Sequence, residues 1–251
     1  MYITGHCFIS DACGLWESRK IYGDAVGYIT FPDYARGHDV GYQQCFIPRR
    51  RSESQELVVS HLLADWWVHY GPRQERTRKG WAYRKMGIFA KMYDDFFSSA
   101  ESNGLRNPAL ERDSYRGFSH TMVEYSIDTW ISRTQSVEHY FHLTKEGVNA
   151  IDTEQLSKHL GFIADEFDMT SDIFCSDLKS FKERVDRADC TADWVLFAGL
   201  KKFGLTHCPH SLMLLGDCID RGLEQISDQD MTSMLGECIE FVHSRTLANR
   251  I

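Results

Sequence analysis

The chain has 251 residues, of which 43% are hydrophobic and 25% are charged, values typical of a globular protein with a sizeable core. Its formal net charge is −8, and the whole excess falls in residues 131–251, because residues 1–130 carry 16 basic and 16 acidic side chains. This acidic balance argues against sequence-independent binding to nucleic acid, which requires a positive surface.

Cysteine usage and hydropathy bear on the compartment in which the chain works. The eight cysteines are irregularly spaced and form no C-x-x-C pair, which excludes a zinc ribbon and indicates reduced, mostly buried thiols. The first residues, MYITGHCFISDACG, lack a basic region followed by a long apolar stretch, so we expect no secretory signal. No run of eighteen apolar residues exists, so we expect no membrane span and a cytoplasmic protein.

The predicted elements are helices. Residues 21–50, rich in glycine, tyrosine and turn residues, are expected to form a structured loop region. Residues 53–70 predict a helix that begins near Ser52 and ends at Gly71 and Pro72, with further helices over 78–100 and 113–133. The remaining helices are expected at 134–145, 152–165, 170–187, 191–203, 209–223 and 229–246. We therefore predict one all-α domain over residues 1–251, with a metal site in 1–130 and a helical packing region in 131–251.

The segment SHLLADWWVHYG (60–71) places polar residues at every fourth position of the first long helix. His61, Asp65 and His69 share one face of that helix, since residues four apart lie one turn above each other. The residues between them are apolar, so the stripe is expected to face inward. Buried imidazoles and carboxylates need partners, and a divalent cation would satisfy all three together. The alternative is a structural stripe, with His69 placed at the helix end because of the helix dipole.

A second stripe with the same period follows in SHTMVEYSID (119–128). His120, Glu124 and Asp128 again have apolar or aromatic neighbours. Asp128 is expected either to orient a histidine or to form an ion pair. Three further candidate ligands precede both helices, namely His6, Asp33 and His38. A set of imidazoles and carboxylates without clustered thiolates suits Zn²⁺, and also Mn²⁺ or Fe²⁺.

The order of these residues resembles the zinc-dependent phospholipase C and S1/P1 nuclease superfamily, and most closely its bacterial zinc-dependent phospholipase C-like branch. Members carry an early histidine, a loop with a Pro-Asp pair (here Pro32-Asp33) and a histidine-bearing stretch. A helix with H-x-x-x-D and a nearby histidine follows, and then a helix with H-x-x-x-E-x-x-x-D. Order and approximate spacing agree over residues 1 to about 130. The implied metal ligands are His6, Asp33, His38, His61, Asp65, His69, His120 and Glu124.

The resemblance implies an all-α hydrolase of phosphoesters that uses a site of two or three zinc-type ions. Asp65 would bridge two ions, and Asp33 would be a ligand or would orient the attacking water. Candidates to hold the phosphate are Arg36, Arg73 and Arg116, and the substrate is expected to be a small intracellular phosphoester. Two other functions stay open: a di-iron or di-manganese oxidase that tailors a small metabolite, and a non-catalytic helical interaction protein. The sequence leaves the oligomeric state open.

Overall fold

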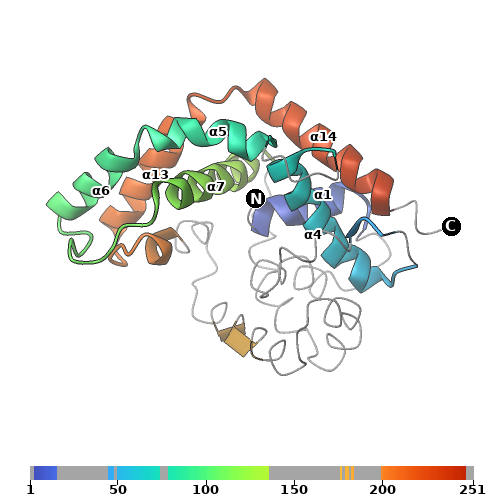
Figure 1. Ribbon diagram of the computed structural model, residues 1–251, viewed down its shortest axis with the longest axis horizontal. Coiled ribbons are helices and arrows are strands. Elements are labelled where there is room, and N and C mark those ends of the chain that lie inside the picture. Colours follow the sequence, from blue (N-terminus) through green and yellow to red (C-terminus); the bar gives the residue numbers. More distant parts are fainter. Residues whose placement is uncertain are drawn as a thin grey trace.

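The computed structural model describes residues 3–15, 45–47, 50–73, 79–135 and 199–246, together with a few helical positions between 176 and 183. Within these residues the chain forms α-helices and no β-strand, which confirms the predicted all-α fold. The helices seen in Figure 1 are α1 (Ile3–Ala12), α4 (Glu53–Tyr70), α5 (Trp81–Ala90), α6 (Tyr93–Ser102), α7 (Tyr115–Gln135), α13 (Pro209–Leu223) and α14 (Asp228–Thr246).

Helix α4 lies in the core and has the bounds that the sequence predicts. Ser52 caps its first turn: the Gln55 amide donates to the Ser52 hydroxyl, and the Gln55 side chain accepts from the Ser52 amide. Gly71 ends the helix with a φ of 81°, a backbone conformation that disfavours residues with a Cβ. Every residue from 56 to 69 is buried, so the helix has no solvent face over more than three turns.

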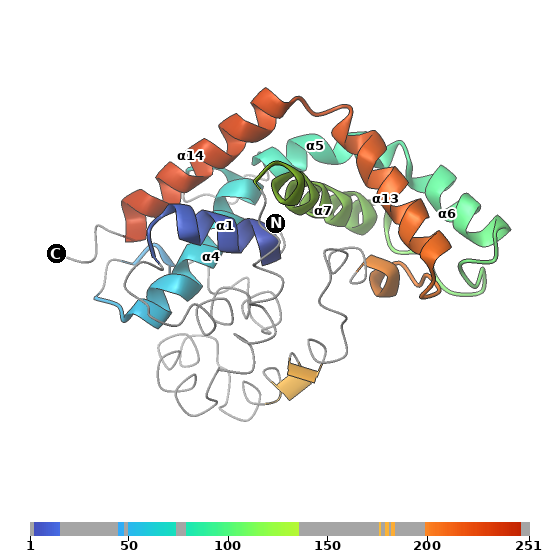
Figure 2. The same ribbon diagram turned by 180° about the vertical axis from the view of Figure 1, so that it is seen from behind.

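Helix α1 is a second buried helix, and the sequence did not predict it. It packs against α4, α7 and α14, and Figure 2 shows it next to α4 and beneath α14. Residues 4–10 are all buried except the partly exposed Phe8. A helix buried on all sides has no polar face, so the hydrophobic period that marks a surface helix is missing.

The prediction of one helix over residues 78–100 is wrong. The chain forms α5 and α6 and bends at Lys91 and Met92, where the Met92 amide donates to the Phe89 carbonyl at 2.9 Å in a tighter turn. No proline marks this bend. It lets α5 pack against α4 and α7 while α6 packs against α13 and α7, and this tertiary packing overrides the continuous helical pattern.

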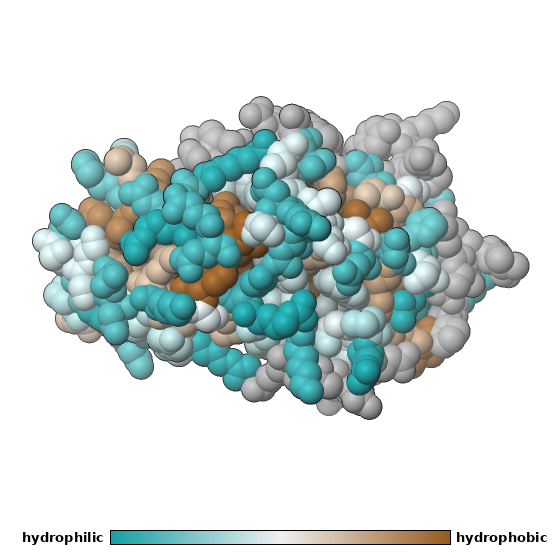
Figure 3. Space-filling model, turned by 90° about the horizontal axis from the view of Figure 1, so that it is seen from above, coloured by the Kyte–Doolittle hydropathy of each residue, from teal (hydrophilic) through white to brown (hydrophobic). Residues whose placement is uncertain are grey.

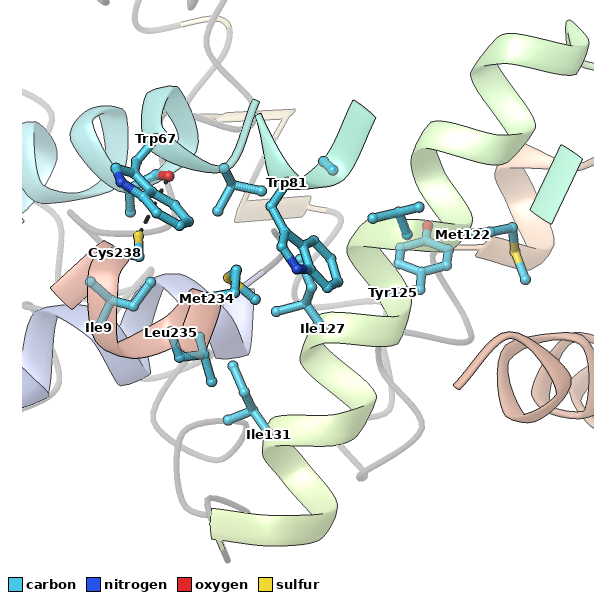
Figure 4. Packing of buried hydrophobic residues seen from close by; sticks show 14 of the residues in the cluster. Ile9, Trp67, Trp81, Met122, Tyr125, Ile127, Ile131, Met234, Leu235 and Cys238 are labelled. Carbon is cyan, nitrogen blue, oxygen red and sulfur yellow. Dashed lines mark hydrogen bonds between the residues drawn. The ribbon is translucent and has the colours of Figure 1, made fainter. Parts of the chain in front are cut away.

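The two C-terminal helices close the core and match the predicted ranges 209–223 and 229–246. Helix α14 packs on α4, and the Cys238 thiol donates to the Ala64 carbonyl at 3.8 Å (Figure 4). Helix α13 approaches α5 so closely that a Cβ on Gly222 would lie 2.1 Å from the Phe89 ring. Residues 199–202 are helical, as predicted within 191–203, whereas the helices expected at 134–145, 152–165 and 170–187 lie mostly outside the described residues.

Arg106 joins the loop between α6 and α7 to the C-terminal part of the chain. Its side chain is 1% exposed and makes an ion pair with Glu101 at 2.9 Å. The guanidinium also donates to the carbonyls of Phe203, Leu110 and Glu111 at 3.2, 2.8 and 2.6 Å. A buried charge is tolerated only when it is paired and hydrogen-bonded in this way.

Polar side chains cover most of one face of the described residues. On the face seen in Figure 3, brown apolar residues show in gaps between teal polar side chains. None of the described helices is both long and apolar enough to cross a membrane. All six described cysteines are free thiols, and five of them are buried, as the sequence predicts.

Replacing Arg106 tests its place in the fold. We expect Arg106→Ala to lower the free energy of unfolding by about 3 to 5 kcal/mol, because it leaves several buried carbonyls without their donor and removes one of the two arginines that pair with Glu101. Arg112→Ala is the matched control, since Arg112 pairs with the same Glu101 but its side chain is 32% exposed, and we expect a much smaller loss of stability. Urea denaturation measures the free energy of unfolding of both variants. Equal losses would contradict the structural role assigned to Arg106.

Candidate metal centre

Two helices bring three of the predicted ligands together. His69 lies in the last turn of α4, and His120 and Glu124 lie one turn apart on α7. The Nε2 atoms of the two histidines are 2.6 Å apart, and their rings are stacked with centroids at 4.7 Å. Glu124 reaches both rings, with Oε1 at 3.4 Å from His69 Nε2 and Oε2 at 3.5 Å from His120 Nδ1. One potential ligand atom from each residue lies within 4.8 Å of the others.

His69 carries the proton in this cluster. Burial alone would lower the pKa of its imidazole, but the carboxylates of Asp65 and Glu124 raise it to about 10. Burial, together with the positive charge of His69, lowers the pKa of His120 against the opposing effect of Glu124. The short contact between the two imidazoles is therefore a hydrogen bond from protonated His69 to neutral His120. Burial would raise the pKa of Glu124, but the hydrogen bond and the positive charge of protonated His69 help to hold it well below its usual range.

Asp65 supports His69 from the side opposite to His120. The Nδ1 atom of His69 lies 2.8 Å from the Asp65 carbonyl oxygen and 3.2 Å from the Asp65 carboxylate oxygen Oδ1. These contacts turn the Nε2 atom of His69 toward His120 and Glu124. A carboxylate that holds the second nitrogen of a metal-binding histidine is a common arrangement around metals. The bridging role expected for Asp65 stays a prediction.

His6 and His61 form a second imidazole pair deeper in the core. Their rings, from α1 and α4, are stacked with centroids 3.5 Å apart, and both side chains are fully buried. At a rise of about 1.5 Å per residue, His61 lies about 12 Å from His69 along α4, with Asp65 halfway. The stripe therefore connects two imidazole pairs. Metal binding by His6 and His61 stays a prediction, and the expected ligands Asp33 and His38 lie outside the described residues.

Asp128 has a role that the sequence analysis did not suggest. Its carboxylate is fully buried and accepts from the first-turn amides of α1, from Thr4 at 2.8 Å and from Gly5 at 3.2 Å. A carboxylate at a helix N-terminus satisfies amides that have no partner within the helix and complements the helix dipole. The contact ties α1 to α7 directly before His6 in the chain.

Gly80 fixes the position of His69, and the sequence analysis did not single it out. Its amide donates to the His69 carbonyl at 2.9 Å, and a Cβ at this position would lie 2.1 Å from the His69 carbonyl carbon. Only glycine fits this close approach of the start of α5 to the end of α4. Tyr83, also missed, contacts both cluster histidines from α5, with ring centroids 5.8 Å from His69 and 6.0 Å from His120. A lone tyrosine or glycine in a helical segment gives no sequence pattern that distinguishes it.

No protein-family model, curated protein or solved structure matches the chain. The resemblance to the phospholipase C and S1/P1 nuclease superfamily therefore stays a prediction, which rests on the order of the motifs.

The role of Asp128 gives a test of how α1 is held. We expect Asp128→Ala to lower the free energy of unfolding by about 2 to 4 kcal/mol, because two buried amides lose a charged acceptor. The exposed Asp217 on α13 supplies the control, and Asp217→Ala should change stability by less than about 0.5 kcal/mol. Denaturant titration measures the free energy of unfolding of both variants. An unchanged value for Asp128→Ala would show that α1 does not depend on this carboxylate.

Proposed function

We propose that the chain is a metal-dependent hydrolase of phosphoesters, with a divalent cation, first of all Zn²⁺, held by His69, His120 and Glu124. One observation carries the proposal: two imidazole nitrogens and a carboxylate oxygen, from two helices, converge within 4.8 Å. Two histidines and one glutamate are a common ligand set of catalytic zinc, and they leave a coordination position for water or substrate.

The protonation of the cluster fits a cation. Two Nε2 atoms at 2.6 Å need a proton between them to avoid repulsion of their lone pairs, and they would move apart to bind one cation at about 2.0 to 2.1 Å each. A cation would replace the proton on His69, and both nitrogens would then act as neutral donors to it. Glu124 supplies negative charge at the same place, and Asp65 holds His69 in the tautomer that presents Nε2.

The cluster is also open to a substrate. The side chain of His120 is 29% exposed, whereas those of His69 and Glu124 are 6% and 12% exposed. A bound cation would supply Lewis acidity, which lowers the pKa of a water and offsets charge on a phosphoryl oxygen. In the reaction a water oxygen bonds to phosphorus, the bond from phosphorus to the ester oxygen breaks, and that oxygen leaves as an alcohol with a proton.

The composition of the site favours hydrolysis over oxygen chemistry. Di-iron and di-manganese oxidases in helical bundles use several glutamates in Glu-x-x-His pairs. The two histidines here meet one glutamate, and the other carboxylate of the stripe, Asp65, faces His69 Nδ1. The buried free thiols suit a reducing compartment such as the cytoplasm, and thus a small intracellular substrate. Two or three ions, with His6 and His61 among the ligands, remain part of the proposal.

Metal content tests the centre directly. The protein is purified without a metal-binding tag and its metals are measured by elemental analysis. We expect at least one equivalent of zinc in the wild type and a large loss in His120→Ala and Glu124→Gln. His243→Ala is the control, since His243 is exposed on α14. Less than one equivalent, unchanged in the two cluster variants, would contradict a metal site; iron with visible absorption in air would favour the oxidase.

Activity is measured on the zinc-loaded protein with bis(4-nitrophenyl) phosphate as the diester and 4-nitrophenyl phosphate as the monoester. We expect hydrolysis of at least one, with a loss of at least about 100-fold in Glu124→Gln, because even residues that only support metal ligands contribute up to about this factor. Removal of zinc by a chelator should abolish hydrolysis and its return should restore it. A zinc-loaded protein that hydrolyses neither compound would contradict the proposed reaction while leaving the metal site intact.

A further inference from the structure

The open side of the cluster identifies the groups that a substrate meets first. Because His120 is the most exposed of the three cluster residues, a ligand from solvent reaches the cluster beside its ring. The residues around that ring therefore set which substrates bind.

An aromatic wall flanks this opening. Tyr83 lies beside both cluster histidines, and Tyr70, from the end of α4, lies with its ring centroid 6.1 Å from both Tyr83 and His69. Both tyrosines are partly exposed. The two rings, tilted by 52° relative to each other, border one side of the cluster.

Arg116 lies on this wall. It precedes His120 by four residues on α7, so it occupies the same face one turn earlier. Its guanidinium carbon is 5.6 Å from the centroid of the Tyr83 ring, within the range of a cation–π contact. The ring restricts the long side chain and holds the charge next to the cluster.

The charge of Arg116 is not neutralised by an ion pair within the described residues. Two other arginines, Arg112 before α7 and Arg133 in its last turn, are paired with Glu101 and Asp220, at 2.5 and 2.6 Å. No described carboxylate forms an ion pair with Arg116, and its side chain is exposed. An arginine fixed on an aromatic ring and open to solvent offers its planar fork of N–H donors to an oxyanion, a geometry that matches phosphate.

The other arginines that the sequence offered do not have this position. Arg73 is exposed beyond the end of α4, and its carbonyl accepts from the Trp66 indole at 2.9 Å. No contact joins its guanidinium to the cluster among the described residues. Arg36 lies outside them.

We propose that Arg116, held over Tyr83, is the residue that binds the phosphoryl oxygens of the substrate beside the His69–His120–Glu124 cluster. This inference rests on the proposed function and adds its substrate class: a phosphoester whose phosphate is accessible enough to contact the guanidinium and the cluster at once. Arg116 then orients the phosphate for attack and offsets its charge, while the tyrosine wall contacts the ester group.

Inorganic phosphate is the probe, and isothermal titration of the zinc-loaded protein measures its affinity. We expect Arg116→Gln to bind phosphate 10- to 100-fold more weakly, since a charge-assisted contact is lost, and Arg116→Lys to lie between it and the wild type. Tyr83→Phe keeps the ring and should bind as the wild type does, while Tyr83→Ala should bind several-fold more weakly.

Arg133→Gln is the matched control, because Arg133 is an exposed arginine on the same helix but is paired with Asp220. It should bind phosphate within about twofold of the wild type. Zinc content is read for every protein and should be unchanged in all Arg116 variants. Wild-type affinity in Arg116→Gln, or no phosphate binding by the zinc-loaded wild type, would overturn the assignment of Arg116. A wild type without bound zinc would instead overturn the metal centre, and the two failures are therefore distinguishable.

Discussion

The contact between His69 and His120, closed by Glu124, is the interaction on which the arrangement of the helices depends. It crosses between α4 and α7 at the edge of the apolar core, where the largely buried His69 and Glu124 would be destabilising without a partner. The three side chains can contact one another only if α4 and α7 keep the same relative position. Helix α5 packs against both and contributes the tyrosine that covers the cluster.

Contacts to the backbone position two of the imidazoles, those of His69 and His6. At the start of α5, Gly80 rests directly on the carbonyl of His69, so the end of α4 cannot move without moving α5. At the start of α1, two amides are bound by Asp128, so the position of His6 depends on α7. The helix that supplies His120 and Glu124 thus also positions a histidine more than a hundred residues away in the sequence.

The sequence predicted best what local chemistry determines. Ser52, Gln55 and Gly71 are capping residues, and the bounds of α4 follow from them. The inward direction of the two stripes followed from their apolar neighbours, and His69, His120 and Glu124 do converge. The sequence did not predict α1, which has ten residues and shows no amphipathic period, whereas the equally buried but longer α4 was marked by its capping residues. Nor could it predict the bend at Met92, which the packing of α5 and α6 on different neighbours imposes. The roles of Asp128 and Tyr83 depend on partners distant in the chain, which a single sequence does not reveal.

Helix α14 covers apolar surface of the segment that contains the candidate site. All the predicted ligands precede residue 130, but the helix that carries three of them has no face of its own for water, and α14 covers one of its sides. A gene fragment that ends after α7 would expose the apolar surface around Ala64 and Trp67, which Cys238 and its neighbours cover in the whole chain (Figure 4). The segment that contains the predicted ligands is therefore not expected to fold as an independent unit. A recombined or shortened form of this protein would need to keep α14 as well as α1.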